Sequence, residues 1–257
     1  MTDPILCTTS DGVLNIHFNR PEKKNALTNA MYGAWADAME AAAHDPGVRA
    51  ILFTAAGDAF TSGNDIMDFA QVATGALAQA DMQVGRVLKA LAYAEKPLVA
   101  AVTGVAVGIG ATMLLHCDLV YCADEAKIST PFVSLALVPE AASSLLLPQA
   151  IGAKRAYAMF ALGEALTGKE AEAFGLVTRS LPRDQVEAAA REAAQRLVRL
   201  PAGALKQTKL LMRDAQAIAA LMDREGQVFN QQLLSGEAKE AFSAFFERRA
   251  PDFIKVA

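Results

Sequence analysis

Short, wholly apolar runs alternate with segments of helical spacing along the first half of the chain. In the helical segments, apolar residues recur every three to four positions, as on one face of an amphipathic helix. A repeat of strand and helix predicts right-handed crossovers and a largely parallel sheet. The predicted strands span residues 5–9, 13–18, 48–55, 98–102, 119–123 and 127–129, and the predicted helices span residues 29–43 and 71–94.

Beyond residue 150 the spacing of apolar residues becomes helical almost throughout. Helices are predicted at 145–151, 154–162, 170–174, 185–199, 204–214, 215–234 and 237–249, with one brief strand at 177–180. We therefore expect an α/β core over residues 1–195, which binds the substrate, and a helical region over residues 196–257. This region is too small to fold by itself, so its apolar faces must cover its own core or a neighbouring subunit.

The segment 96–118, KPLVAAVTGVAVGIGATMLLHCD, predicts a buried strand, a glycine turn and a helix that begins near Gly108. Such a turn exposes the first N–H groups of the helix at its positive end, where a negative group is favoured. Tight packing of helix on strand explains the same glycines equally well. A dinucleotide fingerprint is excluded because Met113 stands where its third glycine belongs, and no phosphate-binding P-loop pattern is present.

Two further loops carry polar residues. Residues 56–69 follow a predicted strand and contain Gly63, Asn64 and Asp65. Because the carboxyl ends of parallel strands meet at one sheet edge, this loop and the glycine turn are expected to lie together and form a site. The third loop contains Pro139 and Glu140. From the pattern alone, Glu140 could equally be a solvated acid in the first turn of a helix.

Composition narrows the classes of function. The 257 residues are 53% hydrophobic and carry a net charge of −4 with a pI near 5.5, which argues against a nucleic-acid surface. The three cysteines form no pairing motif, and neither a secretion signal, a membrane span nor a terminal SKL is visible, so we expect a cytoplasmic location. The histidines show no metal spacing and no G-x-S-x-G occurs, which argues against a metal site and against a Ser–His–acid triad. The remaining candidate groups are one acid and two backbone turns that can present N–H donors. This combination suits proton transfer next to a stabilised oxyanion.

Four segments, in this order, resemble signatures of the enoyl-CoA hydratase/isomerase (crotonase) family: NRPEKKNAL at 19–27, AFTSGNDIMDF at 59–69, the glycine segment at 96–118, and TGKEAEAFGLVTRSL at 167–181. The resemblance implies a crotonase-like (ClpP/crotonase) α/β fold. Its twisted sheet core binds the acyl-CoA and carries out catalysis, and its helical C-terminal region serves trimerisation and covers the active site. It also implies an acyl-CoA substrate, a role in fatty acid metabolism such as β-oxidation, and a homotrimer or dimer of trimers. No cofactor is expected apart from coenzyme A as part of this substrate. From the acidic balance and the lack of a long apolar run, we expect that the protein binds neither nucleic acid nor membrane.

The resemblance also assigns residues. The oxyanion hole of the family corresponds to the backbone N–H groups of Asn64 and Ile109. The remaining substrate and coenzyme A contacts correspond to Lys24, Ala26, Leu27, Ser62, Gly63, Asp65, Ile66, Gly108, Phe132 and Leu137. Phe132, Leu137 and Val138 are expected to form an apolar wall that raises the pKa of Glu140.

Both glutamates that hydratases of this family use are absent. Thr112 stands at the first position, and Thr130-Pro131-Phe132 occupies the second. The pattern SGND, TPF and PE-x-x-SS is similar to Δ3,Δ2-enoyl-CoA isomerases of the peroxisomal type, in which the single catalytic acid corresponds to Glu140. We therefore expect an isomerase, with a hydratase or another acyl-CoA enzyme of the family as one alternative and a non-catalytic acyl-CoA-binding protein as the other.

Overall fold

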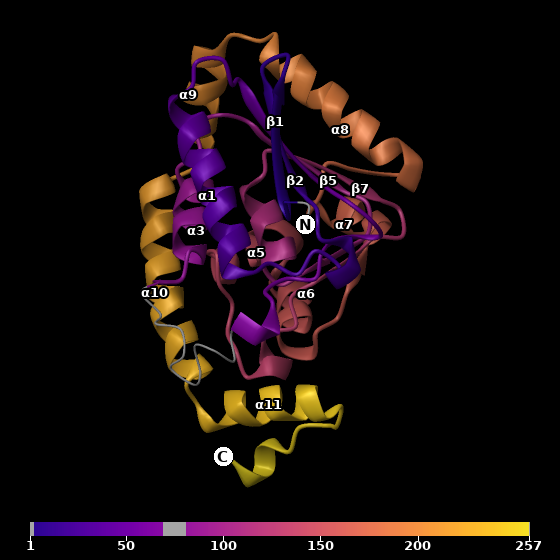
Figure 1. The fold of residues 1–257 in the computed structure, drawn as a ribbon, viewed down its shortest axis with the longest axis vertical. Helices are drawn as coiled ribbons and strands as arrows, with labels where there is room; N and C mark the ends of the chain where they lie inside the picture. Colours follow the sequence, from indigo (N-terminus) through magenta and orange to yellow (C-terminus); the bar gives the residue numbers. More distant parts are fainter. Residues whose placement is uncertain (1–2, 69–80, 257) are drawn as a thin grey trace.

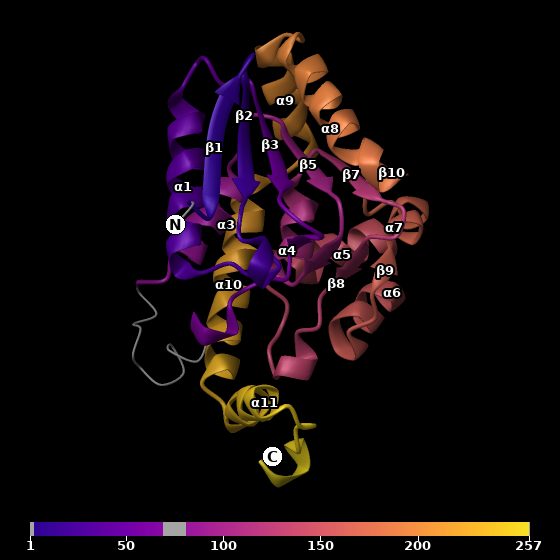
Figure 2. The ribbon, with the colours of Figure 1, turned by 45° about the vertical axis from the view of Figure 1, so that its right-hand side comes forward.

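A six-stranded sheet forms the centre of the protein, seen here in a computed structural model that describes residues 3–68 and 81–256. Its strand order is β1-β2-β3-β5-β7-β10, which Figure 2 shows from left to right. β1 and β2 form an antiparallel hairpin, and every other neighbouring pair is parallel, as predicted. The strands are β1 Ile5–Ser10, β2 Val13–Phe18, β3 Ala50–Ala55, β5 Leu98–Val102, β7 Leu119–Ala123 and β10 Arg179–Leu181.

A second, four-stranded sheet lies beyond the carboxyl ends of the central strands. Its order is β4-β6-β8-β9, and three of its strands were not predicted. They are two or three residues long, too short for a pattern of alternation to show. The members are β4 Ala59–Thr61, β6 Val105–Val107, β8 Lys127–Ser129 and β9 Leu166–Thr167. β4 and β6 hold the loop after β3 beside the glycine turn after β5.

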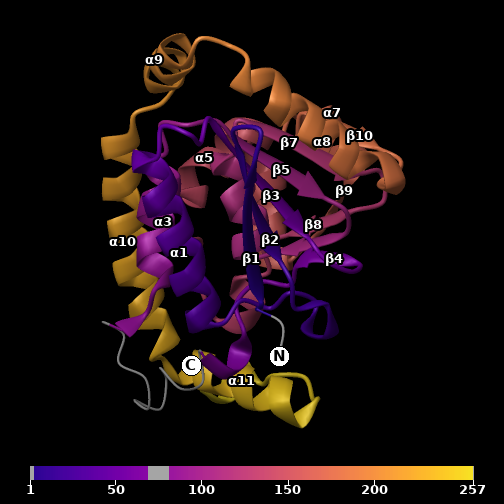
Figure 3. The same ribbon diagram turned by 45° about the horizontal axis from the view of Figure 1, so that its top comes forward.

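Helices cover both faces of the central sheet. α8 (Arg183–Val198) lies across β3, β5 and β7, whereas α1 (Asn29–His44) packs against the β1–β2 hairpin on the other side (Figures 1 and 3). Thr28 caps α1 because its side chain accepts the N–H of Met31. α3 (Val84–Ala92) packs on α1, and α10 (Ala215–Leu233) packs on α3. The C-terminal α11 (Gly236–Glu247) extends at the end of the molecule opposite α8 and α9 (Figure 1).

The remaining helices are short. They are α4 Ile109–Thr112, α5 Ser143–Ile151, α6 Ala153–Tyr157, α7 Gly168–Phe174 and α9 Ala202–Met212, the 3-10 turns Pro21–Lys23, Met113–His116, Val133–Leu135 and Phe253–Lys255, and a π turn Ala158–Leu162. The predicted helix 71–94 is found only as α3. Residues 81–83 precede it, and residues 71–80 lie outside the described residues. Within the parts of the chain that the structure describes, no helix combines the length and apolar character needed to cross a bilayer.

One hydrophobic core joins these elements. Trp35 is its centre and packs edge-on against Phe18 and Phe53. The predicted boundary at residue 195 falls inside α8, three residues before that helix ends. α10, beyond that boundary, contributes Ile218, Met222 and Leu233 to the same core. The helical region therefore packs on the α/β core of its own chain, and its role in oligomerisation stays a prediction.

Candidate active site

The loop after β3 and the glycine turn after β5 meet at one sheet edge. Gly63 has a φ of +90°, and a Cβ there would lie 2.9 Å from the carbonyl oxygen of Val107. A Cβ on Gly110 would lie 2.6 Å from the side chain of Thr61. Both glycines are thus required by the close approach of the two turns. Packing and a shared site are therefore not alternatives here, because the packing creates the site.

The two turns carry the N–H groups of Asn64 and Ile109, the predicted oxyanion donors; Asn64 lines the cavity described below, and Ile109 is buried and does not. A parallel bridge between Leu27 and Asn64 uses the N–H of Asp65 and the carbonyl of Gly63. Ile109 is the first residue of α4, and the N–H groups of Ala111 and Thr112 return to the carbonyl of Gly108. Neither Asn64 N–H nor Ile109 N–H donates to another described residue. Two such donors at one edge can stabilise an oxygen that gains negative charge.

Glu140 faces the glycine turn from a separate loop. Its carboxylate accepts a hydrogen bond of 2.5 Å from the hydroxyl of Thr112. It precedes α5, which starts at Ser143, so the expectation of a solvated acid in a helical first turn does not hold. Thr112, the residue at the position of the absent hydratase glutamate, therefore orients the remaining acid.

The loop that carries Glu140 is held in an unfavourable backbone conformation. Ala141 and Ala142 have φ values of 59° and 57°, a left-handed region that costs an alanine about 1–2 kcal/mol. The carboxylate of Glu225 on α10 accepts the N–H groups of Ala142 and Ser144 at 2.6 and 3.0 Å. Such a strained backbone persists only where neighbouring groups stabilise it, and here the carboxylate of Glu225 does so.

His116 supports the same loop from below. Its Nε2 donates to the carbonyl of Ala141 at 2.8 Å, and its Nδ1 accepts from Arg213. Burial and the charge of Arg213 lower the pKa of His116 to about 3, so the ring is neutral. His116 is therefore a buried, hydrogen-bonded core residue and no catalytic base.

The environment of Glu140 makes it a base suited to neutral pH. Burial raises the pKa of its carboxyl from 4.5 to about 7, the hydroxyl of Thr112 opposes this rise, and the charge of Glu225 adds to it. A catalytic base works best when its pKa lies near the operating pH. Tyr32 is also buried beside this site, and burial raises its pKa well above 10, so it stays a neutral donor to the Asn64 side chain at 2.5 Å.

The raised pKa predicts a measurable cost in stability. Between pH 4.5 and 7 the folded state binds a proton that the unfolded state has lost, so the free energy of unfolding falls as pH rises. Above pH 7, Glu140→Gln should therefore be more stable than wild type by about 1–3 kcal/mol, and the gain should vanish at roughly pH 4. Urea unfolding at both pH values measures this difference. An equal change at both would contradict the raised pKa.

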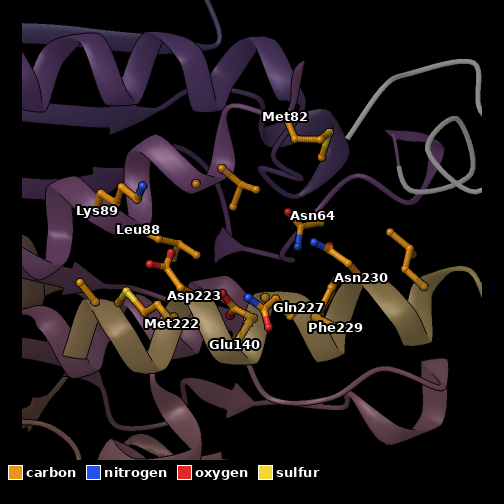
Figure 4. Close-up of a pocket in the computed structure, with 16 residues that line it drawn as sticks. Asn64, Met82, Leu88, Lys89, Glu140, Met222, Asp223, Gln227, Phe229 and Asn230 are labelled. Atoms are coloured by element: carbon orange, nitrogen blue, oxygen red, sulfur yellow. The ribbon is translucent and has the colours of Figure 1, made fainter. Parts of the chain in front are cut away.

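A cavity of about 310 Å³ joins these groups to the surface between α3 and α10 (Figure 4). Glu140 and Asn64 line its inner part, while Lys89, Asp223, Gln227 and Asn230 bring polar atoms into it. Its apolar lining comes from Met82, Val84, Leu88, Met222, Phe229 and Leu233. Such a lining suits a flexible apolar chain with a polar head near Glu140.

The predicted apolar wall differs from the observed one. Phe132 and Leu137 are buried, and Phe132 packs on Phe160 with ring centroids 6.0 Å apart, but neither residue lines the cavity. Val138, the third residue of the predicted wall, does not line it either. All three lie in the segment that leads to Glu140, where the N–H of Leu137 donates to the carbonyl of Phe132 at 2.9 Å. The wall is supplied by α3 and α10. α10 belongs to the C-terminal helical region that was expected to cover the active site, whereas the part of α3 was not predicted.

The remaining predicted contact residues lie at the turn edge. Lys24 is exposed, and its carbonyl accepts the N–H of Ser62. Asp65 forms an ion pair of 2.7 Å with Arg20, which gives it a structural partner. Ala26, Leu27, Gly63, Ile66 and Gly108 belong to the same two turns and their bridge but do not line the cavity. Among the described residues, no three His, Cys, Asp or Glu side chains cluster as metal ligands would.

Glu225 is the functional candidate that the sequence analysis missed. It lies on the apolar face of α10 with Ile218 and Met222, and all three are buried. A charged residue in an apolar stripe needs a buried partner, because an unpaired buried charge is costly. The presence of Glu225 in the apolar stripe could therefore have identified it as a candidate from the sequence.

The central parallel sheet, the small second sheet and the paired turns with their facing carboxylate define a crotonase-like α/β fold. Residues 8–255 match the sequence pattern of the family described as enoyl-CoA hydratase/isomerase. A crystal structure of an enoyl-CoA hydratase/isomerase from Pseudoalteromonas atlantica superposes with a TM-score of 0.92 at 43% identity, covering 98% of this chain and all of that one.

Two curated relatives differ in their described reactions. Enoyl-CoA delta isomerase 2 of Rattus norvegicus is 36% identical over 95% of this chain, which spans only 64% of that relative. The 2,3-dehydroadipyl-CoA hydratase of Escherichia coli is 31% identical over 97% of this chain and 98% of its own length. The chain belongs to the enoyl-CoA hydratase/isomerase family, a family of acyl-CoA enzymes.

Proposed function

We propose that this protein is a Δ3,Δ2-enoyl-CoA isomerase. One observation carries the proposal: a single carboxylate with a pKa of about 7, Glu140, faces two main-chain donor turns, and Thr112 stands where hydratases of the family carry a further acid. An isomerase can use one acid, because the base that removes a proton becomes the acid that returns it.

The proposed reaction has two proton transfers. The Glu140 carboxylate takes a proton from C2 of a 3-enoyl-CoA, and the electrons of that C–H bond form a dienolate whose charge lies on the thioester oxygen. The N–H groups of Asn64 and Ile109 stabilise this oxygen. The Glu140 carboxyl then gives the proton to C4 as the carbonyl re-forms, which leaves the double bond between C2 and C3. No cofactor takes part in these steps.

Separate assays with a 3-enoyl-CoA and a 2-enoyl-CoA test the proposal. We expect the 3-enoyl-CoA to become the conjugated 2-trans isomer, and the 2-enoyl-CoA to gain water slowly or not at all. Rapid hydration with no isomerisation would assign the site to a hydratase. A chain that binds CoA esters but fails to exchange the C2 proton for deuterium would be a non-catalytic binding protein.

Hydratase activity is the second candidate, because another carboxylate, Asp223, lines the same cavity. It lies on α10, which faces α3 across the cavity (Figure 4). Asp223 is exposed, whereas a water-activating acid is expected to be shielded. Asp223→Asn distinguishes the two candidates, since it should abolish hydration and leave isomerisation largely intact.

The acyl chain is proposed to occupy the cavity between α3 and α10. Gly226 in α10 lines it, and a Cβ at this position would meet no atom within 4 Å. Gly226→Leu should therefore fold normally, since leucine favours a helix by several tenths of a kcal/mol over glycine, and should fill part of the cavity. We expect kcat/KM to fall about tenfold or more for long acyl chains and little for short ones, because a lost apolar contact of about 1.4 kcal/mol changes binding tenfold.

A series of 3-enoyl-CoA esters of increasing length measures this effect. Gly203→Leu is the matched control, because Gly203 is also helical with open space around it but lies on α9. An equal loss for every chain length would place the acyl group elsewhere.

For coenzyme A we propose the edge formed by Lys24, Ala26, Leu27 and residues 62–66, with exposed Lys24 meeting a phosphate. We also propose a homotrimer or a dimer of trimers. Apolar side chains that face solvent in the single chain support it, among them Leu211, Met212, Phe245 and Phe246, which are 88%, 82%, 54% and 48% exposed. Sedimentation equilibrium measures the assembly.

A further inference from the structure

Glu225 lies outside the set of residues that the proposed proton transfer uses, yet it contacts the loop that carries the base. It is one of the few charged residues buried in the part of the chain that the structure describes, with 7% of its surface exposed. Its two carboxylate oxygens each accept one main-chain N–H, from Ala142 and from Ser144. The Ser144 side chain also hydrogen-bonds this carboxylate, and the charge of Arg224 acts on it. A carboxylate buried on an otherwise apolar helix face is costly unless such partners satisfy it.

The conformation of the contacted loop explains why those bonds matter. Ala141 and Ala142 both adopt left-handed backbone angles, which a free loop of alanines would leave. The N–H of Ser143 turns back to the carbonyl of Glu140 at 3.0 Å, so the reversal of the chain starts at the base itself. Removing the acceptors of Ala142 and Ser144 releases the strained turn and, with it, the direction of the Glu140 side chain.

We propose that Glu225 is a positioning residue for Glu140: its carboxylate holds the strained turn at residues 141–144 and so aims the base at C2 and C4 of the substrate. This inference rests on the proposed isomerase function. Glu225 itself does not reach the reacting atoms. It belongs to α10, the helix that also forms one wall of the cavity, so the base and the acyl chain are positioned by the same element.

The negative charge of Glu225 affects the pKa of Glu140, and measuring this pKa distinguishes a positioning role from a purely structural one. Its negative charge raises the pKa of Glu140, although burial contributes more. The other titratable or charged groups around Glu140 are Tyr32 of α1, Lys89 of α3, Asp223 of α10, and the neutral His116 with Arg213 behind it. A substitution at Glu225 leaves all of them in place.

Glu225→Gln is the test. The glutamine retains one acceptor oxygen, while its NH₂ group faces the second main-chain donor, so the turn loses one bond and gains a repulsion. We expect kcat for the 3-enoyl-CoA to fall about 10–100-fold with KM changed less than about threefold, because a base displaced by about 1 Å loses up to 10²-fold in rate. The acid limb of the pH–rate profile should shift to lower pH. Glu192→Gln, an exposed acid inside α8, is the control and should leave both unchanged.

A second measurement does not depend on turnover. Unfolding is measured as a function of pH for wild type, Glu140→Gln, Glu225→Gln and the double variant. The pH-dependent difference that Glu140→Gln makes in each background gives the pKa of Glu140 in that background. We expect a lower value in the Glu225→Gln background. If the wild type fails to isomerise but this shift is found, the proposed function is wrong while the coupling stands. If the wild type isomerises, and kcat, the acid limb and the Glu140 pKa are all unchanged in Glu225→Gln, the positioning role is refuted.

Discussion

Glu140→Gln is expected to lose about 10²–10⁴-fold in kcat on a 3-enoyl-CoA, the range that a positioned general base contributes. The loss should lie toward the upper end because the same carboxyl serves both proton transfers. Glutamine keeps the oxygen that accepts from Thr112, so the loop and the cavity stay intact. The rate of formation of the conjugated product and the rate of C2 deuterium exchange should fall together.

Two comparisons separate this loss from unfolding. The variant is expected to be more stable than wild type above pH 7, so its inactivity cannot follow from a damaged fold. Glu125→Gln removes an exposed acid from a turn away from the cavity and should retain wild-type rates. Retention of most of the isomerase rate by Glu140→Gln would show that another group moves the proton.

Gly108→Ala should lower kcat by about 10²–10³-fold, the effect of losing one oxyanion donor, or about 2.7–4 kcal/mol. Gly108 has φ 58° and ψ −120°, angles that alanine adopts only with strain. A Cβ there meets nothing within 4 Å, so the effect comes from the backbone alone. The ψ angle of Gly108 sets the plane of the peptide that carries the Ile109 N–H, and relaxing it turns that donor away.

Gly152→Ala provides the matched control for this substitution. Gly152 also has a positive φ, 85°, and open space around its Cα, but it lies between α5 and α6 at a distance from both turns. Both variants should lose comparable thermal stability, and only Gly108→Ala should lose kcat with little change in KM. If the two variants retained activity equally, the Ile109 N–H would not be an oxyanion donor.

The sequence predicted the elements whose patterns are local. The run 98–102 is apolar at every position, and β5 has those limits, because a strand buried on both faces needs no alternation. Thr28 and the apolar stripe after it likewise define α1. β4 and β6 were not predicted, because each has only three residues. The two strands are stabilised by pairing with each other across 44 or more intervening positions, and not by a local preference of the sequence.

Only the two turns and the loop that carries Glu140 could be predicted from the sequence. Asn64 and Glu140 lie on loops and Ile109 begins α4, next to glycines and a proline that are visible in the sequence. The structure brings Glu140 and Asn64 to one cavity, which Ile109 does not line. For the opposite wall, the sequence predicted only that the C-terminal helical region covers the site, without naming α10 or α3. The amphipathic face of α10 could have covered a neighbouring subunit as well as its own core, and only its packing on α3 shows that it encloses the site.

The central claim is that one carboxylate serves C2 and C4 of a thioester whose oxygen is held by the main chain. A crystal structure with an unreactive acyl-CoA bound measures this most directly. We predict a Glu140 oxygen within about 3–3.5 Å of both carbons, and a thioester oxygen about 2.7–3.1 Å from the nitrogens of Asn64 and Ile109. Asp223 nearest to C2, or a thioester oxygen bound away from these two nitrogens, would contradict the claim.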